Sequence, residues 1–212
     1  MDAKATVKLG PYSRRGMSRL RVRAADHDFQ PVALLTPVGL LLPDTAELCY
    51  FGITSKVTSD CLVDCLEHWW EAQQARFPLV RTLLLNLDNG PECHSRRTQF
   101  MHRLVAFANR TGITVQLAYY PPYHSKYNPI ERCWGVLEQH WNGALLDSVD
   151  TALQYAATMT WKGRPPLVVR LDKRYATGVR LLKAAMEALE GQIERLPELS
   201  KWFVTIPGAH CT

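Results

Sequence analysis

An alternation of apolar and polar residues opens the chain and predicts a β-strand. Every second position from residue 3 to residue 9 is apolar, and the positions between them are polar or charged. Successive side chains of a strand point to opposite faces, so this period of two favours a half-buried strand over residues 2–9. Asp2 falls on the polar side of that strand.

Further strands are predicted from alternating or continuous apolar runs. The longest of these stretches allows a hairpin around Pro43 and Asp44, where turn residues interrupt the apolar pattern. The predicted strands cover residues 20–29, 33–53, 81–87 and 113–119. The first two are expected to be antiparallel to the opening strand.

Apolar residues recur every three or four positions in the stretches that we expect to be helical. The predicted helices cover residues 59–76, 95–111, 129–141, 148–160 and 178–195. In the first two helices, the side chains expected to face a core are Leu62, Leu66, Trp69, Trp70, Phe100, Leu104 and Phe107. Strands followed by alternating helices and strands indicate an α/β fold.

The helix predicted over residues 129–141 delivers one carboxylate to its first turn. Asn128 is a good N-cap residue and Pro129 a good first helical residue. The core-facing stripe of this helix is Ile130, Trp134, Leu137 and Trp141. Glu131 lies off that stripe, where the helix dipole favours a negative charge. Taken alone, Glu131 is also an ordinary first-turn glutamate.

A second carboxylate, Asp88, follows a short apolar run at the expected end of a strand. Open α/β sheets bind their ligands outside the carboxyl ends of the strands, which makes Asp88 a candidate ligand-binding residue. The sequence Asp88-Asn89-Gly90 is equally typical of a simple turn.

Composition agrees with a single soluble domain. The chain has 212 residues, of which 47% are hydrophobic, so it is long enough to bury a proper core. No apolar run reaches membrane-spanning length, and the first residues do not resemble a signal peptide. The six cysteines show no zinc or disulfide spacing, and we expect reduced thiols in the cytoplasm.

Several short motifs surround the three acidic residues Asp2, Asp88 and Glu131. The most specific is Ser125-Lys126-Tyr127-Asn128-Pro129-Ile130-Glu131. The others are Asp2-Ala3-Lys4, His27-Asp28-Phe29, Trp69-Trp70, Asp88-Asn89-Gly90, Pro121-Pro122, Leu171-Asp172, Tyr175 with Gly178, and Trp202-Phe203-Val204-Thr205-Ile206.

These motifs resemble those of DDE transposase catalytic domains, which share the RNase H-like fold of retroviral integrases. The resemblance is closest to ISAzo-type bacterial insertion-sequence transposases and extends from Asp2 to about Pro207. It implies an RNase H-like α/β fold, with a central five-stranded mixed sheet flanked by helices. The expected organisation is one catalytic domain over residues 1–212, in which residues 162–212 form a C-terminal extension with extra helices.

The resemblance also implies the chemistry. Asp2, Asp88 and Glu131 would be both the catalytic triad and the ligands of two Mg²⁺ ions, for which Mn²⁺ substitutes. Hard cations prefer carboxylate oxygens, and a pair of such ions suits phosphodiester cleavage. Water would first hydrolyse a DNA strand at the element's end, and the freed 3′-hydroxyl would then attack target DNA. A homodimer or higher oligomer acting on DNA in the nucleoid-associated cytoplasm is expected.

The chain departs from the family pattern in two places. After the second acid, Asn89-Gly90-Pro91-Glu92 stands where the family often has Gly-Gly-Gly-Ser. Only Met1 precedes Asp2, although family members carry an N-terminal DNA-binding region with helix-turn-helix character. We therefore expect an isolated catalytic domain that is weakly active or inactive without that region.

Contacts to DNA are expected from basic and loop residues around the acids, because the net charge of +5 is too small to bind DNA without local patches. The residues predicted to touch DNA are Lys126, His124, Ser125, Arg14, Arg15 and Arg132. A second basic segment lies between residues 162 and 180. Basic runs are also common on solvated surfaces that bind nothing.

Two alternatives to an active transposase remain open. The chain could be an inert transposase remnant that only binds nucleic acid or partner subunits. It could also be a structure-selective nuclease, since one fold supports several functions. The string from Asn128 to Glu131 favours the transposase over the nuclease.

Overall fold

A computed structural model describes residues 1–11, 30–121, 124 and 127–209 of the chain. The chain forms two compact units, which are described separately. One contains Met1, residues 57–128 and residues 175–212, and is called the Asp88 unit. The other contains residues 2–56 and 129–174, and is called the Glu131 unit.

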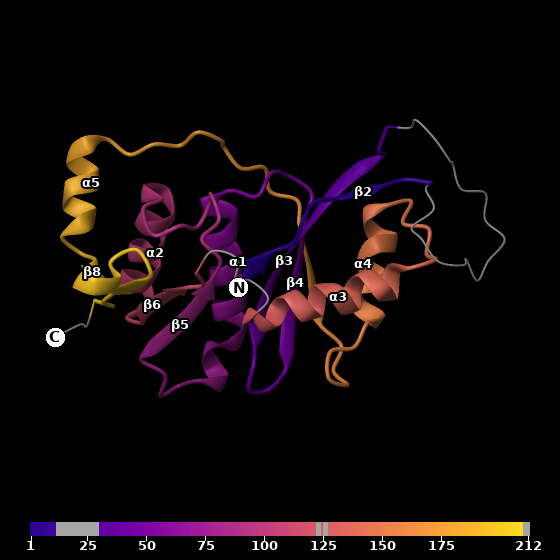
Figure 1. The fold of residues 1–212 in the computed structure, drawn as a ribbon, viewed down its shortest axis with the longest axis horizontal. Coiled ribbons are helices and arrows are strands. Elements are labelled where there is room, and N and C mark those ends of the chain that lie inside the picture. Colours follow the sequence, from indigo (N-terminus) through magenta and orange to yellow (C-terminus); the bar gives the residue numbers. More distant parts are fainter. Residues whose placement is uncertain (12–29, 122–123, 125–126, 210–212) are drawn as a thin grey trace. The chain divides into compact units, whose positions relative to one another are not determined.

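A five-stranded sheet forms the framework of the Glu131 unit (Figure 1). Its strands are β1 (Asp2–Ala3), β2 (Val7–Leu9), β3 (Ala33–Leu42), β4 (Glu47–Ile53) and β7 (Leu167–Leu171). The order is β1-β3-β4-β7, and β2 also pairs with β3. Only the β4–β7 pair among these is parallel. The predicted hairpin around Pro43 and Asp44 is confirmed, because the chain turns there between β3 and β4.

The opening strand predicted over residues 2–9 is present in two pieces. Ala3 is opposite Val38, and Val7 is opposite Leu35. Three residues separate Ala3 from Val7, whereas two separate Leu35 from Val38, so the opening segment carries one extra residue. Such a bulge re-aims the side chains on either side of it. At the break, the Lys4 amide donates to the carbonyl of Pro37 at 2.9 Å.

One predicted strand is not tested, and one observed strand of the Glu131 unit was not predicted. The strand predicted over residues 20–29 lies outside the described residues. Strand β7 was not predicted, although its five residues include a Val-Val pair that favours a strand. Its parallel partner β4 is remote in sequence, and that long-range pairing is not visible in local patterning.

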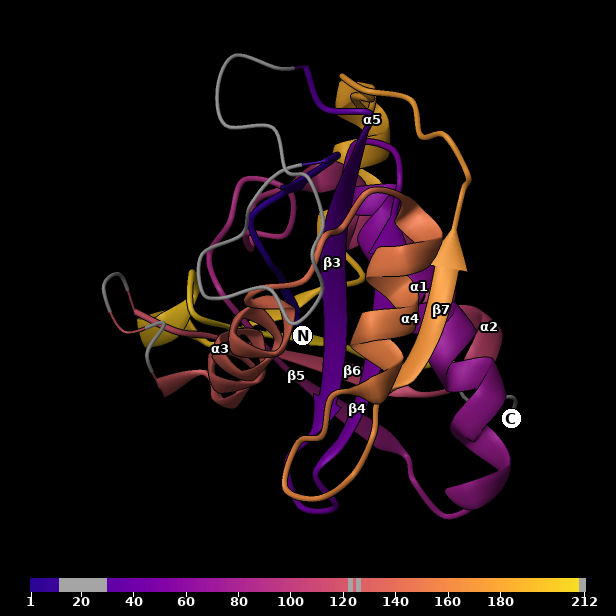
Figure 2. The same ribbon diagram turned by 90° about the vertical axis from the view of Figure 1, so that its right-hand side faces the viewer.

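Helices α3 (Pro129–Trp141) and α4 (Val149–Thr158) cover the sheet of the Glu131 unit, as Figure 2 shows for α4. The predicted core stripe of α3 is confirmed, since Ile130, Trp134, Leu137 and Trp141 are all at most 4% exposed. They join one apolar cluster with residues of β2, β3, β4 and α4. Helix α3 is thereby fixed on the sheet by its whole buried face.

A four-stranded sheet forms the framework of the Asp88 unit. Its strands are β5 (Thr82–Leu87), β6 (Thr114–Tyr119), β8 (Glu194–Arg195) and β9 (Phe203–Ile206). The order is β5-β6-β9-β8, and β5 and β6 are parallel. Strands β8 and β9 were not predicted, and the helix predicted over residues 178–195 is shorter than expected.

The helical segments of the Asp88 unit include two predicted helices close to their predicted ranges and one that is shorter than predicted. They are α1 (Ser59–Gln73), the 3₁₀ turn Gln74–Arg76, α2 (Thr98–Thr111), α5 (Lys183–Glu190) and the 3₁₀ turn Pro197–Leu199. The predicted core residues of α1 and α2 are buried. The Thr58 side chain caps α1 by accepting a hydrogen bond from the Cys61 amide, and Gly112 ends α2 in the left-handed conformation.

The predicted α/β class is therefore confirmed, but the predicted arrangement of the strands differs. We expected one central five-stranded sheet, and the described residues form a five-stranded and a four-stranded sheet. The opening strand has only two residues in β1, and they pair with β3. Strand β5 is an end strand of its own sheet.

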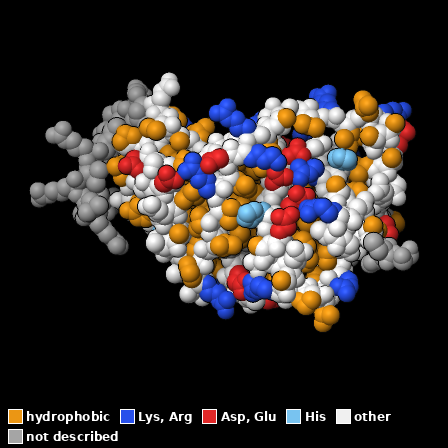
Figure 3. Space-filling model, turned by 180° about the vertical axis from the view of Figure 1, so that it is seen from behind, with side chains coloured by type: hydrophobic (Ala, Val, Ile, Leu, Met, Phe, Trp, Pro, Cys, Tyr) orange, Lys and Arg blue, Asp and Glu red, His pale blue; other side chains and the backbone are white. Residues whose placement is uncertain are grey.

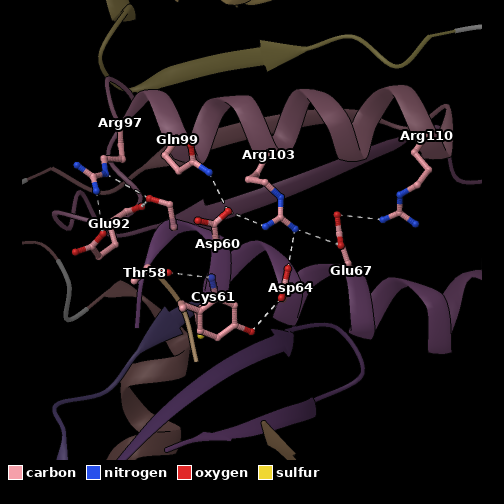
Figure 4. A network of polar contacts seen from close by, with 12 residues as sticks. Thr58, Asp60, Cys61, Asp64, Glu67, Glu92, Arg97, Gln99, Arg103 and Arg110 are labelled. Carbon is pink, nitrogen blue, oxygen red and sulfur yellow. Dashed lines mark hydrogen bonds and ion pairs between the residues drawn. The ribbon is translucent and has the colours of Figure 1, made fainter. Parts of the chain in front are cut away.

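Charged side chains join α1 to α2 in the Asp88 unit (Figure 4). The Arg103 guanidinium donates to Asp60 at 2.8 Å and to Asp64 at 2.7 Å, and Tyr175 donates to the other oxygen of Asp64 at 3.0 Å. Burial opposes the charged form of Arg103, but the hydrogen bonds to Asp64 and Asp60 outweigh it and raise the pKa of Arg103. This network fixes the two helices in register.

We expect Arg103→Gln to destabilise the protein by about 2 kcal/mol, because two largely buried carboxylates lose their cation. Chemical denaturation followed by circular dichroism measures this change. The matched control is Lys183→Gln, which breaks an ion pair of 3.9 Å whose side chains are 91% and 70% exposed. That change should cost less than about 0.5 kcal/mol. Equal losses in both variants would contradict the structural role of Arg103.

Candidate functional site

Asp2 is held at the start of the Glu131 unit by a strand and a helix. In β1 it lies opposite Gly39 of β3. The indole Nε1 of Trp134 on α3 donates a hydrogen bond of 2.7 Å to Oδ2 of Asp2. The carboxylate is only partly buried, so its remaining lone pairs can accept further ligands.

Glu131 lies in the first turn of α3, as predicted. The unpaired amides of that turn give it partial positive charge, which stabilises a carboxylate there. A carboxylate oxygen of Glu131 and one of Asp2 lie within 4.8 Å of each other. Oxygen ligands from carboxylates suit hard divalent cations such as Mg²⁺, so this pair fits the metal that the sequence implied.

Asp88 directly follows β5 in the Asp88 unit, at the carboxyl end of the strand, as predicted. The neighbouring strand β6 is parallel, so both strands end at the same edge of their sheet. Asn128 is 2% exposed, and its Nδ2 lies 3.5 Å from Oδ1 of Asp88. The residue directly before α3 is thus also a neighbour of Asp88.

The loop after Asp88 is fixed by side chains that contact its backbone. The Cys93 thiol donates to the carbonyl of Asp88 at 3.2 Å, and the Tyr119 hydroxyl donates to the carbonyl of Cys93 at 2.7 Å. Ser59 donates to the carbonyl of Glu92 at 2.7 Å. Burial raises the pKa of Tyr119, so its hydroxyl keeps its proton and its donor role at neutral pH.

The pKa of Tyr120 is also shifted, in part by the charge of Asp88. Burial first, and then the negative charge of Asp88, raise the pKa of Tyr120 above its ordinary value. The Tyr120 amide donates to the carbonyl of Leu87 at 3.0 Å, which continues the pairing of β5 and β6 beside Asp88. A neutral phenol beside the carboxylate adds no competing charge.

Met1 also contacts the end of β5. Its amino group donates to the carbonyl of Asn86 at 3.0 Å, two residues before Asp88. Met1 and Asn128 both belong to the Asp88 unit, and each is followed immediately by a residue of the Glu131 unit. At both of these unit boundaries, the last residue of the Asp88 unit makes a hydrogen bond, Met1 to Asn86 and Asn128 to Asp88.

The structure describes two of the six residues that are predicted to contact DNA, His124 and Arg132. His124 is exposed, and its ring stacks on that of Tyr127 with centroids 5.7 Å apart. Arg132 is exposed on α3, next to Glu131. The predicted contacts Ser125, Lys126, Arg14 and Arg15 lie outside the described residues, as do His27 and Asp28.

Charge on the visible surface is mixed. In Figure 3, acidic and basic side chains alternate on the face shown and do not gather into a patch of one sign. The described cysteines are free thiols, as predicted, and Cys61 and Cys65 are both buried on α1. No helix among the described residues is long and apolar enough to cross a membrane.

Sequence reasoning missed the side chains that contact Asp2 and the loop of Asp88. Trp134 was predicted only as a core residue, and Cys93 and Tyr119 were given no role at the site. The available signal was chemical, because a tryptophan on a buried stripe still carries one N–H that needs an acceptor. Asn128 was predicted as a helix cap, and its contact with Asp88 was not foreseen.

The sequence of the chain matches a known family. Residues 1–208 match the family model described as the Rhodopirellula transposase DDE domain. None of the curated proteins matches the chain. The match covers nearly all of the sequence and includes all three predicted acids. The chain therefore belongs to the Rhodopirellula transposase DDE domain family, and is a DDE transposase domain of insertion-sequence type with an RNase H-like α/β fold.

Proposed function

We propose that the protein cleaves DNA strands and joins them to target DNA, as the catalytic domain of an insertion-sequence transposase. The observation that carries this proposal is the approach of Asp2 and Glu131, whose carboxylate oxygens lie within 4.8 Å in a chain of the DDE transposase family. Two carboxylates at such a distance repel each other unless a cation lies between them. Their approach supports a metal-dependent reaction.

Asp88 is proposed as the third member of this site. The chain belongs to the DDE transposase domain family, and Asp88 lies in one of the motifs that it shares with that family. Asp88 directly follows β5, at the carboxyl end of the strand, where α/β sheets bind their ligands.

Asp2, Asp88 and Glu131 would hold two divalent metal ions. The expected ion is Mg²⁺, and Mn²⁺ can replace it. Such ions lower the pKa of bound water and stabilise the charge on the attacking and leaving oxygens. The chain's own part is to fix the carboxylates. Trp134 would orient Asp2, and the first turn of α3 stabilises the charge of Glu131. The Cys93 thiol bonds to the backbone carbonyl of Asp88, and Tyr119 holds Cys93 in turn.

The reaction would proceed in two displacements at phosphorus. In the first, a water oxygen bonds to the phosphorus, and the bond to the 3′ oxygen at the element's end breaks, leaving a 3′-hydroxyl. In the second, that hydroxyl oxygen attacks a target phosphodiester, whose own 3′ oxygen leaves. One P–O bond forms as one breaks in each step, so little covalent chemistry is asked of the protein.

DNA would be held by the exposed residues that surround the acids. Arg132 follows Glu131 on α3, and the stacked pair of His124 and Tyr127 precedes the helix. Lys126, Ser125, Arg14 and Arg15 are proposed as further contacts on sequence grounds. Three further properties remain predictions. They are a homo-oligomeric state, a single catalytic domain over residues 1–212 and a nucleoid-associated cytoplasmic location.

We expect Glu131→Gln and Asp88→Asn each to lower DNA strand cleavage by at least about 100-fold, because each removes a charged ligand while keeping the side-chain shape. The assay is cleavage of pre-nicked or branched duplex DNA in Mn²⁺. The control is Glu187→Gln on α5, which changes an exposed glutamate outside the segment that carries Asp2 and outside α3. It should retain cleavage.

Two results of this assay would count against the proposal. Cleavage that survives both Asp88→Asn and Glu131→Gln would exclude the three acids as the catalytic group. Absence of metal-dependent cleavage by the unaltered chain, and also by a longer form that carries a DNA-binding region, would favour the inert remnant. Cleavage of branched DNA without any strand joining would favour the nuclease.

DNA binding should be insensitive to sequence and should weaken with salt, because phosphate contacts release counterions. Replacing Arg14 and Arg15 by Gln should reduce the slope of log affinity against log salt by about 2. Fluorescence anisotropy with labelled duplex DNA between about 50 and 200 mM salt measures the slope. Lys201→Gln, at an exposed position outside the predicted contacts, is the control and should change nothing. An affinity that is independent of salt would contradict phosphate binding.

A further inference from the structure

We propose that Trp134 is a positioning residue of the metal site, whose indole N–H fixes the Asp2 carboxylate in the orientation that metal binding requires. This inference rests on the proposed function. It assigns to Trp134 a role beyond packing, although the residue lies on the buried stripe of α3. Asp2, Glu131 and Trp134 all belong to the Glu131 unit.

The hydrogen bond itself is short and well placed. Nε1 of Trp134 and Oδ2 of Asp2 are 2.7 Å apart, which is typical of a donor paired with a charged acceptor. Indole is a donor only, and Trp134 is 4% exposed, so solvent offers its N–H little alternative. Breaking the bond would leave a buried donor unsatisfied, which is costly.

The ring of Trp134 is held in one position by its neighbours. A Cβ atom at Gly39 would come within 2.7 Å of Cη2 of Trp134 and of Cδ1 of Ile130, so only glycine leaves room for the ring against β3. Gly39 is also the residue opposite Asp2 in the sheet. Tyr50 packs edge-on against the ring with centroids 6.4 Å apart. The donor therefore has a fixed direction.

Asp2 depends on this donor more than a residue inside a long strand would. Strand β1 has two residues, and a bulge separates it from β2. A second link from this segment to α3 is the ion pair of Lys4 with Glu138, one helical turn beyond Trp134. Helix α3 therefore holds the segment at two points.

One rigid helix thus sets the positions of two of the acids. Glu131 and Trp134 are three residues apart on α3, and the buried face of α3 packs on the sheet that contains Asp2. An ionised carboxylate accepts about four hydrogen bonds or ligands, so one bond from Trp134 leaves capacity for a cation. Trp134 would restrict the rotation of the carboxylate without occupying its metal-binding lone pairs.

The test compares two tryptophans on the same face of the same helix. Trp134→Phe removes the N–H donor and keeps an aromatic ring, and Trp141→Phe makes the same change two turns further on, at a residue 1% exposed. Binding of Mn²⁺ is measured by electron paramagnetic resonance of the free ion. We expect about tenfold weaker Mn²⁺ binding for Trp134→Phe, as for other groups that orient metal ligands, and unchanged binding for Trp141→Phe.

The outcomes separate this inference from the proposed function. Equal Mn²⁺ affinity of Trp134→Phe and the unaltered protein would overturn the role of Trp134 and leave the proposed function standing. Absence of Mn²⁺ binding by the unaltered protein, or unchanged binding by Glu131→Gln, would overturn the proposed metal site itself.

A measurement on the unaltered protein covers the case in which Trp134→Phe fails to fold. The indole N–H resonances, labelled with ¹⁵N, are followed during titration with Mg²⁺. The Trp134 resonance should shift as its acceptor gains a cation, and the Trp141 resonance should not. A Trp134 resonance that does not respond to bound Mg²⁺ would overturn the inference.

Discussion

The packing of α3 on β3, next to the first strand, is the interaction on which the candidate site depends. The strand that carries Asp2 is too short to be held by its own backbone hydrogen bonds, and the residue opposite Asp2 is a glycine that admits the ring of Trp134. Burial of that ring contributes about 2–3 kcal/mol of hydrophobic free energy, and the indole N–H adds a directed hydrogen bond to the carboxylate. Packing of the Trp134 ring therefore fixes the direction of the N–H that contacts Asp2. Because Glu131 lies on the same helix, the same packing sets both carboxylates.

Asp88 is supported by a different device in its own unit. Asp88 follows a parallel strand, and its backbone carbonyl accepts a hydrogen bond from the Cys93 thiol. Tyr119 and Ser59 donate to carbonyls further along the same loop. The ion-pair network between α1 and α2 stabilises the helices from which this loop is anchored. These contacts fix the backbone of a turn sequence that is ordinary by itself, at the position of the proposed metal ligand Asp88. Carboxylates that bind metal need such support, since small displacements weaken the site.

Local patterning predicted the parts of the fold that local physics determines. The helix of Glu131, its buried stripe and its first-turn acid follow from residues 128–141 alone, and the β3–β4 hairpin follows from its turn residues. The bulge after Ala3, strand β7 and the division of the strands between two sheets depend on pairing between remote segments, which periodicity does not encode. The same holds for the site. The three acids were found from motifs, whereas the donor that contacts Asp2 became visible only once α3 was packed on its sheet.

The most direct test of the central claim is the location of bound Mn²⁺ by anomalous X-ray diffraction from crystals of the protein grown with the ion. We expect the anomalous peak to lie within about 2.2 Å of carboxylate oxygens of Asp2, Asp88 and Glu131, the usual range for small hard divalent cations. A peak bound by other residues, or no peak at these carboxylates at saturating Mn²⁺, would contradict a metal site formed by the three acids.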